Sequence, residues 1–239
     1  MKPNFITLDS EKHKSLKLAD GNSYSQIKDE NLAPLTIHEF VRVSANMPIV
    51  FIPTGQENGF RAVAMMGLAQ EENLFVGEDS VWDGIIVPES ATIYPFGLAN
   101  DEKDKTKAVL SFDENSDRFT EDGEGRALFN DDGTLTEFHN DALTFIRQHW
   151  ENMQMTMAVL KQFAEQGLLK PFGVALNRPG ETEPYTIDGF HIMDEDKLQE
   201  LSTEDFDTLR KRGLLPAIYA QLTSMQQFNA LARRKFAPK

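Results

Sequence analysis

The stretch Pro48-Ile49-Val50-Phe51-Ile52-Pro53 defines the first element of the predicted fold. It is too short and too uniformly apolar for an amphipathic surface helix, so it predicts a buried strand. Residues 54–59 are turn-like, and residues 60–67 form a second apolar run. The two runs therefore predict a β-hairpin.

Helices are predicted on both sides of this hairpin. Thr36 and Glu39 have the spacing of a capping box, which predicts a helix over residues 36–47. Further along the chain, apolar residues recur at steps of three and four over residues 141–169, the pattern of a long amphipathic helix. Asn140 or Asp141 is the expected cap of that helix.

The remaining elements complete the predicted fold class. Strands are expected over residues 107–112, 172–177 and 185–193, and a mostly helical tail from Asp194 onward, with one last helix carrying Ile218 through Leu231. The acidic segment that follows residue 112 has no periodicity and is expected to be a loop. Strands early and helices late predict an α+β fold: a mixed or antiparallel sheet with a long central helix and a helical C-terminal tail.

A single domain over residues 1–239 is expected, with a subdivision into residues 1–135, mainly β, and residues 136–239, mainly α.

Composition excludes several classes of function. The chain has no cysteine, so thiol catalysis, disulfides and Cys-ligated metal clusters are excluded. A net charge of −14 argues against nonspecific nucleic-acid binding. No Gly-x-Gly-x-x-Gly or Gly-Lys-Ser/Thr motif occurs, and no cofactor is expected. No apolar run has the length of a membrane span, and the first residues lack the apolar core of a secretory signal, so a soluble, cytoplasmic protein is expected.

Aromatic residues between turn-forming residues mark the centre of the chain. Trp82, Tyr94 and Phe96 lie there among prolines and glycines, and aromatic rings supply much of the apolar contact in small-molecule sites. These three residues, with Glu39 as a buried acid, are the candidate ligand-binding residues. The expected partner is a small molecule, a peptide or a protein. Packing of the same rings in a core is the alternative.

Two other functions stay open. His139 and Asp141, with His191 about fifty residues later, have the residue types of a two-histidine, one-carboxylate iron site, which would make the protein an oxygen-dependent enzyme. An acidic segment at residues 111–141 and a basic tail at residues 210–239 could instead be complementary surfaces of a homo-oligomer, a self-assembling component of the cell envelope. The sequence leaves open whether any reaction is catalysed.

An ordered set of short motifs resembles the SapC family of bacterial proteins, named after a surface-layer-associated protein, over nearly the whole chain. The motifs are His13-Lys-Ser-Leu-Lys-Leu, Pro34-Leu35, His38-Glu39-Phe40, Met47-Pro-Ile-Val-Phe51, Gly67-Leu68, Asn73-Leu-Phe75, Trp82, Val87-Pro88, Tyr94-Pro-Phe96, Gly125-Arg-Ala-Leu-Phe129, Asp132-Gly133, Gly167-Leu-Leu, Gly189-Phe-His-Ile-Met-Asp194 and Leu222-Thr-Ser224-Met.

The resemblance implies a context and no catalytic residue. The family name suggests a cell-envelope role. Relatives occur beside flavin-dependent halogenase-like proteins in settings linked to nutrient uptake. The resemblance therefore implies an accessory or binding protein in such a setting.

Overall fold

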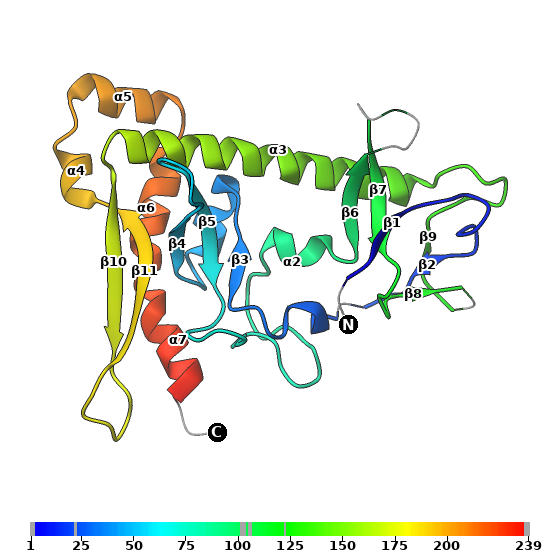
Figure 1. The fold of residues 1–239 in the computed structure, drawn as a ribbon, viewed down its shortest axis with the longest axis horizontal. Helices are drawn as coiled ribbons and strands as arrows, with labels where there is room; N and C mark the ends of the chain where they lie inside the picture. The colour runs from blue at the N-terminus through cyan, green and yellow to red at the C-terminus, as the bar shows by residue number, and fades with distance from the viewer. Residues whose placement is uncertain (1–2, 22, 101–103, 105–106, 122, 237–239) are drawn as a thin grey trace. The chain divides into compact units, whose positions relative to one another are not determined.

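The computed structural model describes residues 3–21, 23–100, 104, 107–121 and 123–236 (Figure 1). The chain divides into two compact units, each built from two segments of sequence. Unit 1 comprises Met1–Ser23 and Ala91–Glu151, and unit 2 comprises Tyr24–Ser90 and Asn152–Lys239. Each unit has its own cluster of buried apolar side chains. The single-domain expectation stays a prediction.

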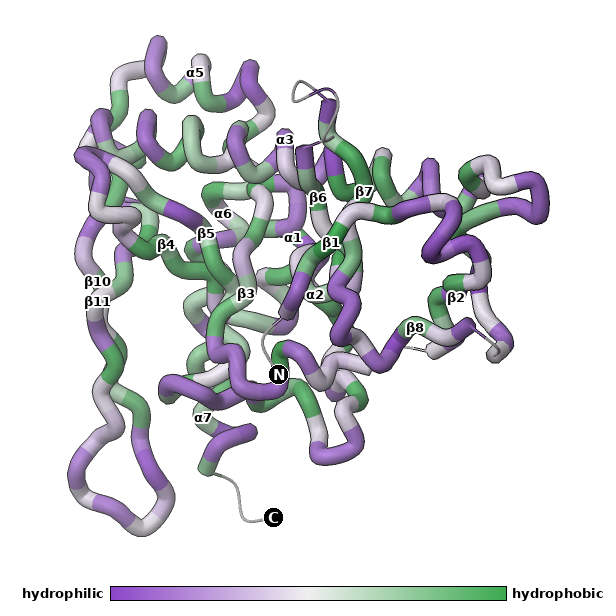
Figure 2. Tube along the Cα trace, turned by 45° about the vertical axis from the view of Figure 1, so that its right-hand side comes forward, coloured by the Kyte–Doolittle hydropathy of each residue, from purple (hydrophilic) through white to green (hydrophobic). Residues whose placement is uncertain are grey.

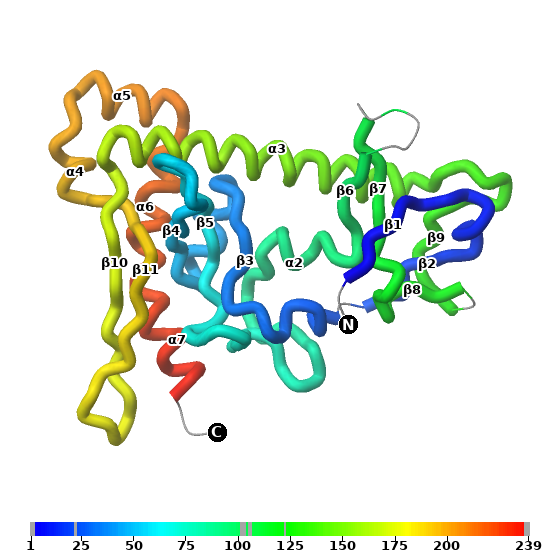
Figure 3. The backbone as a smooth tube through the Cα atoms, viewed as in Figure 1, coloured from blue at the N-terminus to red at the C-terminus, as the bar shows by residue number. Residues whose placement is uncertain are grey.

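Unit 2 contains a five-stranded antiparallel sheet in the order β10-β11-β4-β5-β3. Figure 2 shows β4 and β5 as largely hydrophobic, and Figure 3 shows β10 and β11 side by side as a long hairpin. The α+β class is confirmed, and so are the hairpin of residues 48–67 and the strands predicted over residues 172–177 and 185–193. The strands are β3 (Leu32–Pro34), β4 (Ile49–Pro53), β5 (Phe60–Met65), β10 (Leu169–Leu176) and β11 (Tyr185–Met193).

The helix predicted over residues 36–47 is shorter than expected. Its capping box is present, but the helical segment consists of the 3-10 turn η2 (Ile37–Glu39) followed by α1 (Phe40–Val43). Pro48 disfavours the helical conformation in the residue before it, so the chain leaves the helix through turns and enters β4.

The prediction of a helical C-terminal tail is confirmed, but the prediction that it ends in one helix is wrong. Two helices, α6 (Leu215–Ser224) and α7 (Gln227–Phe236), replace it. The junction has hydrogen bonds of the tighter 3-10 type, from Gln226 N to Thr223 O (3.2 Å) and from Phe228 N to Met225 O (3.3 Å). The other short helices of the chain are η1 (Ser25–Ile27), α2 (Glu89–Ile93), α4 (Glu195–Gln199) and α5 (Thr203–Lys211).

Unit 1 contains two small antiparallel sheets, in the orders β1-β7-β6 and β8-β2-β9. The strand predicted over residues 107–112 is confirmed as β7. The acidic segment after it is not entirely a loop, because β8 and β9 pair with β2 there. The strands are β1 (Phe5–Thr7), β2 (Lys17–Leu18), β6 (Phe96–Asn100), β7 (Ala108–Asp113), β8 (Phe119–Thr120) and β9 (Arg126–Ala127).

The long helix is confirmed as α3 (Glu137–Glu165), whose residues 137–151 belong to unit 1 and residues 152–165 to unit 2. It begins earlier than predicted because Thr136, rather than Asn140 or Asp141, caps it: the hydroxyl accepts the His139 N–H at 3.2 Å. It ends at Gly167, whose φ of +69° is typical of the left-handed residue that follows a helix. Within the described residues, no helix has the length and apolar content of a membrane span.

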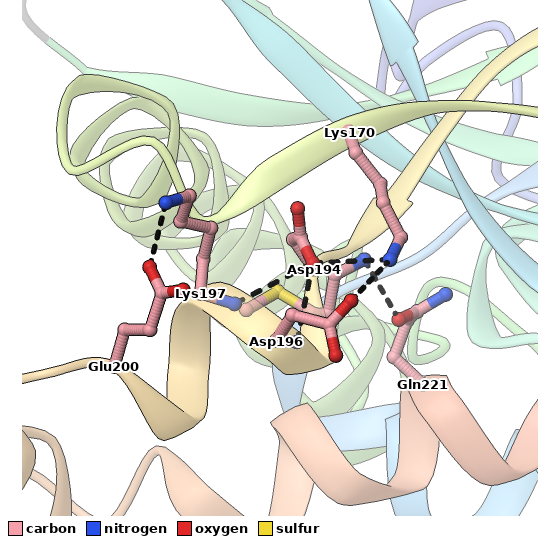
Figure 4. Close-up of polar contacts among 7 residues, drawn as sticks. Lys170, Asp194, Asp196, Lys197, Glu200 and Gln221 are labelled. Atoms are coloured by element: carbon pink, nitrogen blue, oxygen red, sulfur yellow. Dashed lines mark hydrogen bonds and ion pairs between the residues drawn. The ribbon is translucent and has the colours of Figure 1, made fainter.

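A buried amide joins the strands of unit 2 to α6. Gln221 accepts the Met193 N–H at 3.0 Å and donates to the Ile49 carbonyl at 2.9 Å. Figure 4 shows this side chain near the end of β11, where Asp194 caps α4 and accepts from Lys170 Nζ at 3.0 Å. The hydrogen bond from Lys170 holds the pKa of the Asp194 carboxyl below its usual range. These contacts fix the register of β11 against the helical tail.

Candidate functional site: a groove in unit 1

A groove of about 1210 Å³ opens in unit 1. It lies where β1 stops pairing with β7: the β1–β7 register ends at Thr7 and Ser111, whereas β6 continues to pair with β7 as far as Ala108. The space left between the diverging strands is bordered by α3 and by the turn before it. The described lining residues are Ile6 to Ser10, Lys12, His13, Lys107 to Leu110, Glu114, Phe129, Gly133 to Leu135, His139, Asn140, Leu143 and Arg147.

The walls of the groove combine apolar and polar side chains. Leu110 and Phe129 are buried in the core of unit 1, so the floor of the groove is continuous with that core. Leu135 remains exposed at the rim. Small-molecule sites are usually more apolar than this groove, whose lining is divided between apolar and polar side chains.

His13 is held in one orientation at the groove. Its Nδ1 accepts the Asp9 N–H at 2.9 Å, and its ring packs edge-on against Phe112 with the ring centroids 5.1 Å apart. Because Nδ1 is used as an acceptor, the neutral ring carries its proton on Nε2. His13 therefore offers a hydrogen-bond donor.

His139 has the opposite tautomer. Its Nδ1 lies 3.4 Å from Asn140 Oδ1, and an amide oxygen only accepts, so Nδ1 carries the proton and Nε2 is an acceptor. Burial lowers the pKa of His139, against a smaller opposing effect of the Asn140 hydrogen bond. This ring is therefore neutral at physiological pH.

Charged residues surround the groove with an excess of cations. Lys12, Lys107 and Arg147 face only two carboxylates, Asp9 and Glu114, whereas the whole chain has a net charge of −14. Arg147 donates to the Ala108 carbonyl through Nη2. The lining thus has one more cation than carboxylates in a protein of net charge −14.

Two of the candidate ligand-binding residues belong to unit 1, where they pack and bond within the unit. The Tyr94 hydroxyl donates to Asp113 Oδ2 at 2.9 Å, and burial raises the pKa of this hydroxyl. Phe96 is 7% exposed and packs edge-on against Phe119 and Phe138 at 5.6 and 6.1 Å between ring centroids. Neither residue is among those that line the groove.

Trp82 belongs to unit 2, where it forms part of an aromatic stack. Its ring lies parallel to that of Phe75, 5.2 Å away and tilted by 13°, and Arg234 lies over the Phe75 ring at 4.4 Å. Gly84 approaches so closely that a Cβ there would lie 2.6 Å from Trp82 Nε1. Within the described residues, this buried Nε1 has no hydrogen-bond partner.

Glu39, also in unit 2, is 1% exposed and bonded through both carboxylate oxygens. Oε2 accepts from the backbone N–H and the hydroxyl of Thr36 at 2.9 and 3.0 Å, and Oε1 accepts the Glu89 N–H at 2.7 Å. The carboxylate thus ties the start of η2 to the start of α2. The assignment of Trp82, Tyr94, Phe96 and Glu39 as ligand-binding residues stays a prediction, with the four divided between the two units.

The residues of the alternative metal site are also divided. His139 and Asp141 belong to unit 1 and His191 to unit 2. The His191 ring packs against Phe60, with the ring centroids 4.8 Å apart, and its buried Nδ1 has no hydrogen-bond partner within the described residues. The iron site stays a prediction.

The environment of His191 gives a testable pH dependence. Burial lowers the pKa of His191 below its ordinary 6.5, so the unfolded chain binds more protons than the folded one as the pH falls below that value. The stabilisation is complete above the unfolded pKa and is lost on acidification. We expect the urea midpoint of His191→Phe to fall less than that of the wild type between about pH 7.5 and about pH 5.5. His38→Gln, at an exposed histidine, is the control. Equal pH slopes in His191→Phe and the wild type would contradict this explanation.

Sequence reasoning missed most of the groove. Of its residues, only His139 is a candidate site residue on sequence grounds, and for metal binding rather than for a groove. Leu143 lies on the apolar face of the long helix predicted over residues 141–169. Single-sequence patterns carry no signal for the divergence of β1 from β7, on which the groove depends.

Comparison with known proteins gives a family. The SapC family model matches residues 8–231. No curated protein and no solved structure matches the chain.

Proposed function

The chain belongs to the SapC family, and from the groove in unit 1 we propose that it is a binding protein whose ligand occupies that groove. The single observation that supports this proposal is a groove of about 1210 Å³ that joins apolar walls to oriented polar groups. A groove of this volume has room for a drug-sized molecule, since sites for such molecules usually span roughly 300–1,000 Å³.

The two groove histidines favour binding over catalysis. The His13 ring accepts from a backbone N–H and the His139 ring bonds an amide. Within the described residues, neither ring hydrogen-bonds a serine or threonine hydroxyl, the contact that would mark an activated nucleophile. Their fixed tautomers suit recognition of a ligand.

The envelope alternative has less support. Several cations of its basic tail are already bonded inside unit 2: Arg234 pairs with Asp83 at 2.8 Å, and Lys235 pairs with Glu72 at 2.5 Å. Residues 122 and 237–239 of the two proposed surfaces lie outside the described residues. Self-assembly, the cytoplasmic location and a link to nutrient uptake or to a halogenase-like protein remain predictions.

Filling the groove tests the proposal. Leu143 lines it, so Leu143→Trp should block it, whereas Phe145→Trp places the same ring on an exposed position of the same helix outside the lining. Native mass spectrometry of protein purified from its own cells should show a co-purified ligand on the wild type and on Phe145→Trp. We expect occupancy to fall at least about tenfold in Leu143→Trp, a loss of about 1.4 kcal/mol.

Circular dichroism and the thermal midpoint would establish that both variants fold. A folded Leu143→Trp protein with undiminished ligand would contradict the proposal.

A further inference from the structure

We propose that the groove selects an organic monoanion: a carboxylate at the end of an apolar chain. The inference rests on the proposed binding function of the groove and adds the chemical class of the ligand. It depends on which charged groups at the groove are already satisfied and which are not.

The cations of the groove keep their charge available. Arg147 donates to a neutral carbonyl, that of Ala108, which positions the guanidinium without neutralising it. Within the described residues, no ion pair joins Arg147 or Lys12 to a carboxylate, although the charges of Lys12 and Asp9 attract each other. Lys107 pairs with Asp104 at 3.3 Å, but its side chain is 70% exposed, so water screens this contact and leaves it weak.

The carboxylates of the groove are already engaged. Asp9 Oδ1 accepts the backbone N–H groups of Glu11 and Lys12 at 2.9 and 3.0 Å. Glu114 Oε1 accepts from the side-chain amide of Asn4. These bonds come from neutral groups, so both carboxylates keep their charge, and the lining as a whole presents an incoming anion with three cations against two carboxylates.

Three donor groups of the lining can meet a ligand, with His139 Nε2 as an acceptor at the same groove. The guanidinium of Arg147, the ammonium of Lys12 and the Nε2–H of His13 all donate, and a carboxylate only accepts. An ammonium ligand has only donors and would meet like charge. A carboxylate therefore matches the groove, and an amine does not.

The apolar walls define the rest of the ligand. Leu8, Val109 and Leu143 line the same groove as the cations. Each methylene that leaves water for such a wall is expected to strengthen binding by up to about fourfold. An aliphatic chain attached to the carboxylate uses both features.

Three probes that share one chain and differ in the head group test the inference: octanoate, octan-1-ol and octylamine. Titration calorimetry at about pH 7.5 and low salt should show octanoate binding at least about tenfold more tightly than the other two. In Arg147→Gln and in Lys12→Gln, the affinity for octanoate should fall toward that for octan-1-ol. The affinity for octan-1-ol should stay unchanged. Arg126→Gln, which removes an exposed arginine outside the groove, should leave all three affinities unchanged.

The outcomes separate this inference from the proposed function. Equal or tighter binding of octylamine or octan-1-ol overturns the choice of an anion, and if that binding is lost in Leu143→Trp the groove is still the site. Failure of all three probes to bind at millimolar concentration overturns the assignment of an aliphatic carboxylate as the ligand. The binding function is then tested only by the native mass spectrometry of the co-purified ligand. Undiminished octanoate affinity in both Arg147→Gln and Lys12→Gln also overturns it.

Discussion

Gln221→Ala is expected to lower the free energy of unfolding by about 3–4 kcal/mol. The reason lies in the sheet of unit 2, where His191 is paired with Phe51 and the antiparallel register then brings Met193 opposite Ile49. The two strands do not pair at that point. The Gln221 amide bridges them, accepting the Met193 N–H at 3.0 Å and donating to the Ile49 carbonyl at 2.9 Å.

The substitution removes both hydrogen bonds in a site without water access, since Gln221 is 0% exposed. An unpaired buried backbone group costs about 1–3 kcal/mol, and the lost side-chain volume adds a cavity. Urea unfolding followed by circular dichroism measures the change. Gln226→Ala, an exposed glutamine just beyond the end of α6, is the matched control and should change the free energy by less than about 0.5 kcal/mol. A loss under about 1 kcal/mol in Gln221→Ala would show that the bridge is not needed.

Asp113→Ala is expected to cost about 3 kcal/mol in unit 1. The Asp113 side chain is buried, at 3% exposure, and three donors converge on it. Oδ1 accepts the Asn4 and Asn115 N–H groups at 2.7 and 3.1 Å, and Oδ2 accepts the Tyr94 hydroxyl at 2.9 Å. Truncation leaves these donors without their shared acceptor.

A graded series makes the Asp113 prediction sharper. Tyr94→Phe removes only one of the three donors and is expected to cost about 1 kcal/mol. Asp117→Ala, at an exposed aspartate of the same segment, is the control and should be near neutral. Chemical unfolding of the set measures the order of the losses. If Tyr94→Phe destabilised as much as Asp113→Ala, the Asp113 carboxylate would not be the common acceptor.

Local patterns predicted the elements of the fold whose determinants are close in sequence. The β4–β5 hairpin follows from two short apolar runs around a turn, and α3 follows from an apolar repeat, with a start set by Thr136. Prediction failed at helix ends, where a few residues decide between helix and turn, as in the residues before Pro48. The two errors are the length of the helix before Pro48 and the division of the last predicted helix into α6 and α7. In both, a turn sets the helix boundary.

Long-range features could not be predicted in the same way. Met193 and Gln221 meet only after the tail has folded, and nothing near Gln221 in the sequence marks it as a bridge. The groove likewise draws on β1, β7, α3 and the turn before it. Trp82 and Tyr94 are close in sequence, yet the chain passes from unit 2 to unit 1 between them.

Titration of ¹⁵N-labelled protein with octanoate shows whether the unit 1 groove is the binding site. The predicted result is that amide shifts concentrate on groove residues such as His139, Leu143 and Arg147, while the indole N–H signal of Trp82 in unit 2 stays in place. Shifts centred on Trp82 and its stacked neighbour Phe75, with the groove amides unchanged, would contradict the claim and identify the aromatic stack as the site.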